Sequence, residues 1–527
     1  MSVKQEISRR RTFAIVSHPD AGKTTLTEKF LLYGGALQLA GSVTARKQER
    51  TTVSDWLEIE RKRGISVSST VLNFDYNGYR INLLDTPGHN DFSEDTYRVL
   101  MAVDSVIMLI DAGKGVEQQT RKLFEVCRKR NIPVFTFVNK MDRPSRDTLS
   151  ILDEIEQVLD INACPMNWPL GSGVDFKGVW DRRTKQVHLF ERTPRGAFRA
   201  PVSTCGLDDP LISKSLPDDI YETVCEESEI VDEAGADFSM EDITGGKTTP
   251  VFFGSAVNNF GIQLLLDGFI ELSPPPQPRV AGDIRVKPDD SFFSGFIFKI
   301  QANMDPRHRD RMAFIRIVSG KFTKDMSVVH GPSGKKVRLS NTSQVFGRDR
   351  VTVDEAYAGD VIGVVGSNFF GIGDTLSERP EICYDEIPRF PPECFAYIHN
   401  PSPSAYKRFS NGIGQLVQEG LVHLFELNQA AQKTLVMGAV GPLQFELVKY
   451  RLESEYGAQS RVETSPWETA RWIASESPAV SDMRIPHNTS LATDNTGRHV
   501  LLFKGDWHVR YFQENNKGVE LVEAPAG

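Results

Sequence analysis

Short strand-like runs that lead into polar motifs constrain the fold of this chain more than any other feature. Thr12 to Ser17, Tyr79 to Leu84, Pro133 to Val138 and Pro250 to Phe253 are such runs, and each ends beside a cluster of small and polar residues. Ser105 to Ile110 is a further run. Continuous apolar runs are typical of strands that are buried on both faces of a parallel sheet.

A helical pattern follows the first of these runs. Leu26, Phe30 and Tyr33 are spaced i, i+4 and i+7, which places them on one face of a helix. Strand, helix and strand in succession predict an α/β domain built on a mostly parallel sheet with helices on both faces. Ligands of such sheets bind at the carboxyl ends of the strands, where the polar motifs lie.

The length of 527 residues exceeds what one hydrophobic core supports, so about three or four domains are expected. Two proline-rich stretches, Ser273 to Pro278 and Pro388 to Pro392, predict the boundaries. We predict an α/β domain over residues 1–280 with an inserted subdomain at about 160–245, a β-barrel over 281–387 and an α+β domain over 388–527. Within these, Phe176 to Phe190 indicates a hairpin, Ala405 to Leu427 and Pro442 to Tyr456 indicate helices, and the tail from about Ser477 has no assignment.

Composition excludes several classes of protein. The formal net charge is −9, which argues against indiscriminate binding of nucleic acid, although basic clusters such as Arg9-Arg10-Arg11, Arg61-Lys62-Arg63, Arg307 to Arg311 and Lys335 to Arg338 leave room for local contacts. The six cysteines form no CxxC pair, as in reduced cytosolic proteins. We see neither a secretory signal nor an apolar run long enough to span a membrane, so we expect a cytoplasmic protein that does not engage membranes.

The segment from Ser17 to Thr24 predicts a phosphate-binding loop. It matches GxxxxGK[ST] except that Ser17 replaces the first glycine. Gly22 lets the backbone approach phosphate, and Lys23 supplies a point charge for the β- and γ-phosphates. The hydroxyl of Thr24 is a hard oxygen ligand suited to Mg²⁺.

Three later motifs complete a nucleotide site. Asp85-Thr86-Pro87-Gly88 offers a carboxylate that can hold Mg²⁺ through water and an N–H group that can sense a γ-phosphate. In Asn139-Lys140-Met141-Asp142, the Asp142 carboxylate can accept from the two donors of guanine, a pair that adenine lacks. Ser255-Ala256 can offer backbone N–H groups to the guanine oxygen. Each motif is weaker alone, but together they predict a GTP site.

These motifs resemble those of the translational GTPase superfamily, the class of elongation factors Tu and G. Arg63-Gly64-Ile65-Ser66 is similar to its switch I motif, which implies that the Ser66 hydroxyl is a Mg²⁺ ligand. His89 matches the catalytic histidine, which the resemblance implies positions the attacking water when the ribosomal sarcin-ricin loop engages it.

The predicted site therefore has a defined set of members. The nucleotide-binding residues are Ser17, His18, Pro19, Asp20, Ala21, Gly22, Lys23, Thr24, Thr25, Asp85, Thr86, Pro87, Gly88, His89, Asn139, Lys140, Met141, Asp142, Ser255 and Ala256. The expected metal ligands are Thr24, Ser66 and Asp85, the expected catalytic residue is His89, and the expected ligands are GTP or GDP and Mg²⁺.

The architecture narrows the resemblance to one family. The chain has one α/β domain after the barrel, where a translocase needs two further domains, and Val440 to Glu446 and Ser66 are similar to the bacterial peptide chain release factor 3 family. This resemblance implies a ribosome-stimulated GTPase that ejects class I release factors after peptide release, and we expect a monomer off the ribosome. The alternatives are an elongation or ribosome-protection factor, a metabolic GTPase subunit, and a switch that binds GTP without hydrolysing it.

Overall fold

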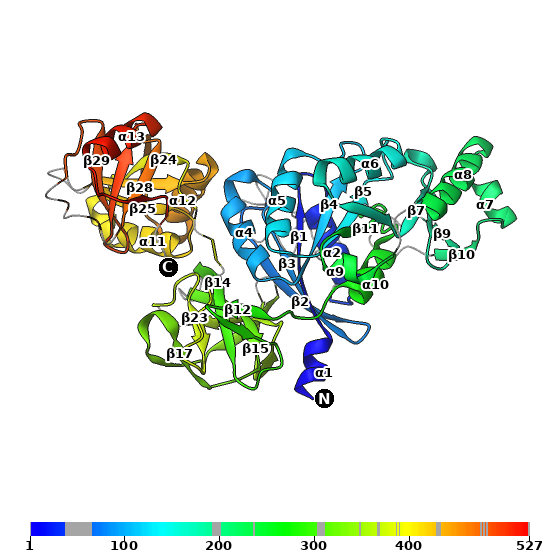
Figure 1. Ribbon diagram of the computed structural model, residues 1–527, viewed down its shortest axis with the longest axis horizontal. Helices are drawn as coiled ribbons and strands as arrows, with labels where there is room; N and C mark the ends of the chain where they lie inside the picture. The colour runs from blue at the N-terminus through cyan, green and yellow to red at the C-terminus, as the bar shows by residue number, and fades with distance from the viewer. Residues whose placement is uncertain are drawn as a thin grey trace.

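The computed structural model describes residues 2–36, 66–191, 202–234, 238–302, 311–346, 349–365, 369–385, 387–388, 390–427, 434–474, 477, 480 and 483–524. Figure 1 shows an α/β region in the middle, a strand-rich region below it and a second mixed region beside both. Among the described residues, no helix has the length and apolar character needed to cross a membrane.

A seven-stranded sheet forms the centre of the first region. Its strand order is β2-β3-β1-β4-β5-β11-β6. The strands are β1 (Arg10–Ser17), β2 (Thr70–Tyr76), β3 (Tyr79–Asp85), β4 (Ser105–Asp111), β5 (Val134–Asn139), β6 (Asn162–Pro165) and β11 (Thr248–Phe253). All neighbours are parallel except β2 and β3, which are antiparallel. The five predicted strands are therefore present, and the mostly parallel sheet is confirmed.

Helices cover both faces of this sheet, as predicted. α2 (Lys23–Tyr33) and α10 (Ile262–Leu272) share one core cluster, which includes the buried Phe30 and Phe269. α4 (Ser93–Met101), α5 (Gln118–Lys129) and α6 (Thr148–Leu159) share the other, which includes the buried Leu123 and Ile151. The two layers hold the carboxyl ends of the strands at one rigid edge.

The chain between β6 and β11 forms a small sheet with helices, which Figure 1 shows at the far right. The sheet order is β10-β9-β8-β7, with β7 (Asn167–Leu170), β8 (Gly178–Asp181), β9 (Gln186–Phe190) and β10 (Val202–Gly206). α7 (Pro210–Ser215) and α8 (Asp218–Ala234) pack beside it, and α9 (Met240–Thr244) leads back to β11. The predicted hairpin is the β8–β9 pair. Because β6 joins the central sheet, the first residues of the predicted insertion belong to that sheet.

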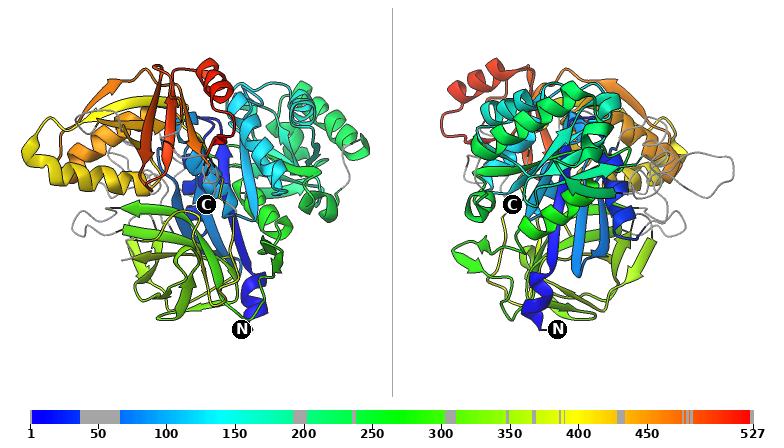
Figure 2. Two further views of the ribbon diagram at one scale, coloured as in Figure 1. Left: turned by 60° about the vertical axis from the view of Figure 1, so that its left-hand side comes forward. Right: turned by 90° about the vertical axis from the view of Figure 1, so that its right-hand side faces the viewer.

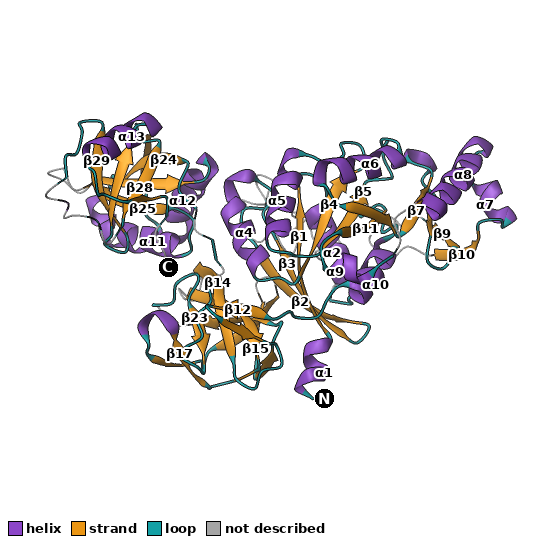
Figure 3. Ribbon diagram, in the orientation of Figure 1, coloured by secondary structure: helices purple, strands orange, loops and turns teal. Residues whose placement is uncertain are grey.

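The second region consists almost entirely of strands (Figure 3). A hairpin of β12 (Arg279–Ala281) and β13 (Ile284–Val286) precedes an eight-stranded sheet of order β18-β17-β23-β14-β15-β22-β19-β20. Its strands are β14 (Ser294–Ala302), β15 (Arg311–Ser319), β17 (Ser327–His330), β18 (Lys336–Arg338), β19 (Thr342–Phe346), β20 (Asp349–Thr352), β22 (Val361–Val365) and β23 (Thr375–Ser377), while β16 (Lys321–Thr323) pairs with β21 (Glu355–Tyr357).

The third region has an eight-stranded sheet of order β27-β24-β26-β25-β29-β30-β28-β31. Its strands are β24 (Cys394–His399), β25 (His423–Leu427), β26 (Thr434–Ala439), β27 (Arg461–Thr464), β28 (Thr469–Ile473), β29 (Thr489–Asp494), β30 (His499–Phe503) and β31 (Leu521–Val522). Its helices are α11 (Tyr406–Gln418), α12 (Pro442–Tyr456) and α13 (Asp506–Asn515). The α12 prediction is confirmed, whereas the helix predicted up to Leu427 is wrong there because α11 ends at Gln418 and β25 follows.

Buried polar contacts join the first two regions. Arg316 of β15 donates to the Asp104 carboxylate at 2.6 Å, and both side chains are 2% exposed. Arg10 of β1 donates to Asp360 at 2.8 Å, and the Thr12 hydroxyl donates to the Gly359 carbonyl at 2.6 Å. Both views in Figure 2 show the strand-rich region directly against the end of the central sheet where the N-terminus lies. Arg10 is therefore a buried structural residue and not a surface contact for RNA.

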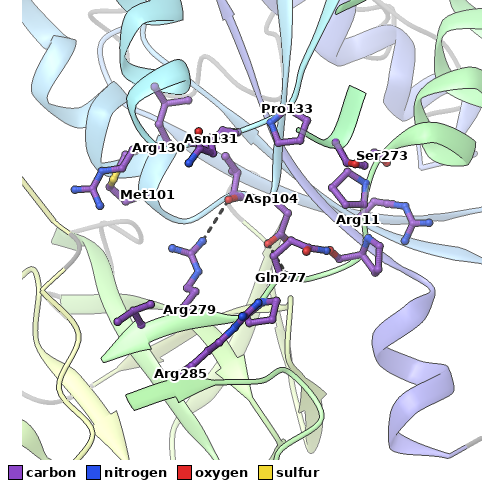
Figure 4. Close-up of a pocket in the computed structure, with 18 of the residues that line it drawn as sticks. Arg11, Met101, Asp104, Arg130, Asn131, Pro133, Ser273, Gln277, Arg279 and Arg285 are labelled. Atoms are coloured by element: carbon purple, nitrogen blue, oxygen red, sulfur yellow. Dashed lines mark hydrogen bonds between the residues drawn. The ribbon is translucent and has the colours of Figure 1, made fainter. Parts of the chain in front are cut away.

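A cavity of about 1090 Å³ lies beside this junction, at the amino ends of the central strands. Figure 4 shows Asp104, Pro133 and Arg11 of the α/β region facing Arg279 and Arg285 of the β12–β13 hairpin across it. Ser273 and Gln277 of the proline-rich linker also line the cavity. It is therefore at the opposite end of the strands from the polar motifs.

Candidate nucleotide-binding site

The predicted phosphate loop joins β1 to α2, and its backbone has the shape that a cradle needs. Asp20 has φ 64° and Gly22 has φ 104°, which is the left-handed region. A Cβ atom at Gly22 would lie 2.4 Å from Asn139 Nδ2. The loop therefore requires glycine here, both for its backbone angle and for the close approach of the neighbouring motif.

Lys23 lies at the amino end of α2, where it faces the next motif. Its ammonium group donates to Asp85 Oδ1 at 3.4 Å and to the Thr86 carbonyl. Lys23 and Asp85 are both buried. The Ile15–Asp85 register between β1 and β3 explains the proximity, since the two strands end side by side. The Ser17 hydroxyl oxygen is also buried, and it has no hydrogen-bond partner among the described residues.

Asn139 connects the phosphate loop to the loop that follows β11. Its Nδ2 donates to the Ala21 carbonyl at 2.8 Å, and its Oδ1 accepts from the Ala256 N–H at 2.9 Å. The Ser255 N–H donates to the Phe260 carbonyl. Both N–H groups of Ser255-Ala256 are thus engaged inside the protein, and this loop supports Asn139. A direct contact of these two groups with guanine stays a prediction.

Lys140 and Asp142, the residues that the sequence predicts to read the base, follow β5 directly. Lys140 has φ 71°, and its ammonium donates to the Asp20 carbonyl at 2.5 Å and to Asp111 Oδ2 at 2.8 Å. The Asp142 Oδ1 atom is buried and has no partner among the described residues. A buried carboxylate oxygen is costly unless it accepts a hydrogen bond, so Oδ1 has room to accept from one of the two guanine donors.

Asp111 is a member of the site that the motifs alone did not reveal. It ends β4 opposite Asn139 in the register of β4 and β5. Burial by itself would raise the pKa of its carboxyl group, but the hydrogen bonds from Lys140 and the Gly113 N–H and the charges of Lys140 and Lys114 outweigh burial and lower it. The strand pattern could have indicated Asp111, because it ends β4 just as Asp85 ends β3 and Asn139 ends β5 in the same parallel sheet.

The three residues expected to hold Mg²⁺ belong to three different parts of the α/β region. Thr24 is the second residue of α2, and Asp85 ends β3. Ser66 precedes β2, whose first residue, Thr70, pairs with Asp85, so the chain at Ser66 extends past the carboxyl edge of the sheet. The hydroxyl and carboxylate oxygens are ligands of the kind that Mg²⁺ prefers. Arg63, Gly64 and Ile65 of the predicted switch I motif lie outside the described residues.

His89 lies just after the Asp85 motif, at the start of the short helix η1 (Asn90–Phe92), and is half-buried. A Cβ atom at Gly88 would meet the Pro19 backbone at 3.6 Å, so this turn packs against the phosphate loop. Thr86 is anchored by a hydrogen bond from its hydroxyl to the Ile15 carbonyl at 2.7 Å. The structure thus brings His89, His18, Pro19 and the phosphate loop to one edge, with Thr25 and Met141 in the elements behind it.

Comparisons with known proteins identify the class first. Residues 8–275 match the family described as the elongation factor Tu GTP binding domain, and residues 292–379 match elongation factor G domain 2. A crystal structure of a protein from Thermus thermophilus has a similar fold, with a TM-score of 0.69 and 23% identity over 92% of this chain and 72% of the other. The fold and the site define a GTPase of the translation-factor class.

The remainder of the chain defines the family. Residues 384–513 match the class II release factor RF3 C-terminal domain. The chain is 52% identical to peptide chain release factor 3 of Gloeobacter violaceus over 98% of both chains, and 50% identical to that of Gloeothece citriformis over 100% of this chain and 98% of the relative. The chain belongs to the peptide chain release factor 3 family and is a translational GTPase of termination.

One basic group considered for RNA contacts has another role. Arg311 is buried, donates to Gln418 Oε1 at 2.7 Å and to the Phe370 carbonyl, and so joins β15 to α11. It is not available to RNA in this arrangement. Arg338 is exposed, whereas Arg307 and Arg309 lie outside the described residues.

Proposed function

We propose that the ribosome activates this chain to hydrolyse GTP in the cytoplasm, and that the GTP cycle drives class I release factors off the ribosome after peptide release. The observation that carries the proposal is the position of His89, which follows the Asp85 motif and lies in a turn packed against the phosphate loop. Family membership supports the ribosome as the setting.

Hydrolysis requires a water molecule in line with the bond between the γ-phosphorus and its bridging oxygen. The water attacks phosphorus, the bridging oxygen leaves with the electron pair of that bond, and GDP and inorganic phosphate result. Most of the catalytic effect in such transfers comes from positioning and charge. In our proposal, ribosomal RNA of the sarcin-ricin loop moves His89 into place, and His89 then orients the water.

Charge stabilisation falls to the phosphate loop and the metal. Lys23 neutralises charge that develops on the β- and γ-phosphates, and the backbone N–H groups at the start of α2 bind phosphate oxygens. Thr24, Ser66 and, through water, Asp85 would hold Mg²⁺, which would supply further positive charge beside the phosphates. Asp142 and Lys140 select guanine and hold the base edge.

The rate of GTP hydrolysis with and without programmed ribosomes tests this proposal. We expect ribosomes to raise turnover by orders of magnitude in the wild type. His89→Ala should lose the stimulated rate while it keeps its affinity for GDP, and His487→Ala, a change at an exposed histidine of the third region, should behave as the wild type. If the wild type turns over GTP at the same rate with and without ribosomes, ribosomal activation is contradicted. If His89→Ala keeps the full stimulated rate, His89 has no part in the mechanism.

A second assay follows a labelled class I factor on termination complexes. Release should be faster with GTP than with GDP or without nucleotide. A non-hydrolysable analogue then separates the two possible driving steps: release with the analogue assigns ejection to GTP binding, and no release assigns it to hydrolysis. Equal release with every nucleotide would contradict the proposed role in ejection.

A further inference from the structure

The turn that carries His89 also carries a contact to the third region of the chain. The Phe92 N–H donates to the His89 carbonyl at 3.1 Å, which closes a single turn over residues 89–92. Phe92 is buried in the core of the α/β region, and the Thr96 hydroxyl donates to the Pro87 carbonyl at 3.3 Å. His89 and Asp91 are thus fixed in one small unit.

Asp91 caps a helix that belongs to another region. Its Oδ2 atom accepts a hydrogen bond of 2.9 Å from the Leu443 N–H, in the first turn of α12. The N–H groups in the first turn of a helix have no partner within the helix, and a carboxylate there also interacts favourably with the helix dipole. The N-cap residue of α12 is Gly441, which has no side chain to cap the helix, and Asp91 provides that side chain from across the interface.

The fit between Asp91 and Gly441 leaves no space for another atom. A Cβ atom at Gly441 would lie 2.2 Å from Asp91 Cγ and 2.6 Å from Asp91 Cβ. Gly441 has φ −145°, which any residue can adopt, so backbone conformation does not require glycine here. The close approach of Asp91 is what requires it.

Two further contacts tie α4 to the same region. The rings of Tyr97 and Phe390 have centroids 5.0 Å apart, and Arg98 donates to the Gly420 carbonyl at 3.2 Å. In Figure 1, α12 lies on the side of the third region that faces α4. The segment directly after His89 is therefore held at three points by a region that is remote in sequence.

We propose that Asp91 is a positioning residue for GTP hydrolysis: by capping α12 from within the His89 turn, it makes the placement of His89 depend on the placement of the third region. This inference rests on the proposed role of His89. A partner that shifts the third region would thereby shift the His89 turn, and a ribosome that moves His89 would in turn act on the third region.

Turnover of the full chain on programmed ribosomes tests the role of Asp91. Asp91→Ala should lower kcat of stimulated hydrolysis about tenfold and leave KM for ribosomes and the affinity for GDP unchanged. Asp91→Asn keeps an oxygen that can accept from Leu443 and should stay within about threefold of the wild type. Asp153→Ala, a change at an exposed carboxylate of α6, is the control and should have no effect.

Gly441→Ala tests the same contact from the other side. It should lower kcat and increase amide exchange in residues 90–101 off the ribosome, because the added methyl group displaces Asp91. In the Asp91→Ala background the same change should cost clearly less than in the wild type, since part of the collision is gone. Additive effects of the two changes would overturn the inference.

The outcomes for Asp91 and for the proposed function are separable. If ribosomes do not stimulate the wild type, the proposed function fails whatever the variants do. If the wild type is stimulated and Asp91→Ala has the same kcat, the positioning role is overturned. Equal losses in Asp91→Asn and Asp91→Ala would also overturn it, because the accepted hydrogen bond would then not be the cause.

Discussion

Gly22 is a position where both the backbone conformation and the close packing require glycine. Gly22→Ala should weaken GDP binding by at least about tenfold, since the new methyl group would meet the Asn139 amide and the left-handed φ is costly for alanine. Gly35→Ala is the matched control, because Gly35 has φ 71° but a Cβ there would meet no described atom within 4 Å. Titration with a fluorescent GDP analogue distinguishes the two, and equal losses would assign the effect to backbone strain alone.

We predict that Asp142 determines which base the site accepts. Asp142→Asn should lower the affinity for GTP by about a hundredfold or more, because a site with mismatched hydrogen-bonding groups rejects its ligand strongly. The same variant should gain affinity for xanthosine triphosphate, whose base offers an acceptor where guanine has a donor. Competition between the two nucleotides measures the change. An unaltered preference for GTP would mean that Asp142 does not contact the base.

The sequence motifs indicate most residues of the candidate site, but they do not show the contacts among those residues. Lys23 contacts Asp85, Asn139 contacts the phosphate loop, and Asp111 pairs with Lys140 without a motif of its own. Asp111 takes part only because Lys140, which follows the neighbouring strand β5, donates a hydrogen bond to its carboxylate. Such a contact follows from sheet register, which a one-dimensional pattern does not contain.

At the level of elements, β25 places a half-buried histidine, His423, beside the helix that follows the His89 turn. Burial lowers the pKa of His423 from its ordinary value of 6.5, with the Glu94 and Asp494 carboxylates opposing the shift and Arg98 adding to it. The ring also stacks with Phe425 and meets Trp472 edge-on. The folded protein therefore keeps His423 neutral at a pH where the unfolded chain is protonated.

A pH dependence of stability follows from this shift. Because the pKa is lower in the folded state, the contribution of His423 is complete above about pH 6.5 and declines as the pH falls toward the lowered value, by up to about 1.4 kcal/mol per pH unit. The melting temperature of the wild type should fall more steeply between pH 7.5 and 5.5 than that of His423→Phe. His487→Phe should keep the slope of the wild type, and an unchanged slope in His423→Phe would contradict the assignment.

Elements with a clear period were predicted well, and those that depend on distant partners were not. The β8–β9 hairpin and α12 lie where local patterns indicated. The residues from His423 to Leu427 read as the end of a helix, yet β25 forms because β26 and β29 pair with it on both sides. The unassigned tail supplies β29, β30 and β31, whose partners lie in this same sheet.

For the whole molecule, the Arg316–Asp104 pair is one of the buried polar contacts that join the α/β region to the strand-rich second region. Arg316→Ala leaves the Asp104 carboxylate buried without this partner, and removal of one member of a buried ion pair costs about 3–5 kcal/mol. The urea midpoint of unfolding should therefore fall clearly. Lys321→Ala, at the exposed pair with Glu355 in the same barrel, should leave the midpoint unchanged. Equal midpoints for the two variants would show that the buried pair does not join the regions.

The sequence by itself predicted the chemistry of this protein, namely which residues should meet phosphate and which should select guanine, and it indicated the family that carries that set. It could do so because these functions depend on short motifs whose residues are neighbours in the chain. Only the tertiary structure decided which distant residues contact those motifs and the regions around them. Asp111 beneath Lys140, Arg316 against Asp104 and Asp91 at the start of α12 are contacts between elements far apart in sequence. Only packing and sheet register bring such partners within hydrogen-bonding distance.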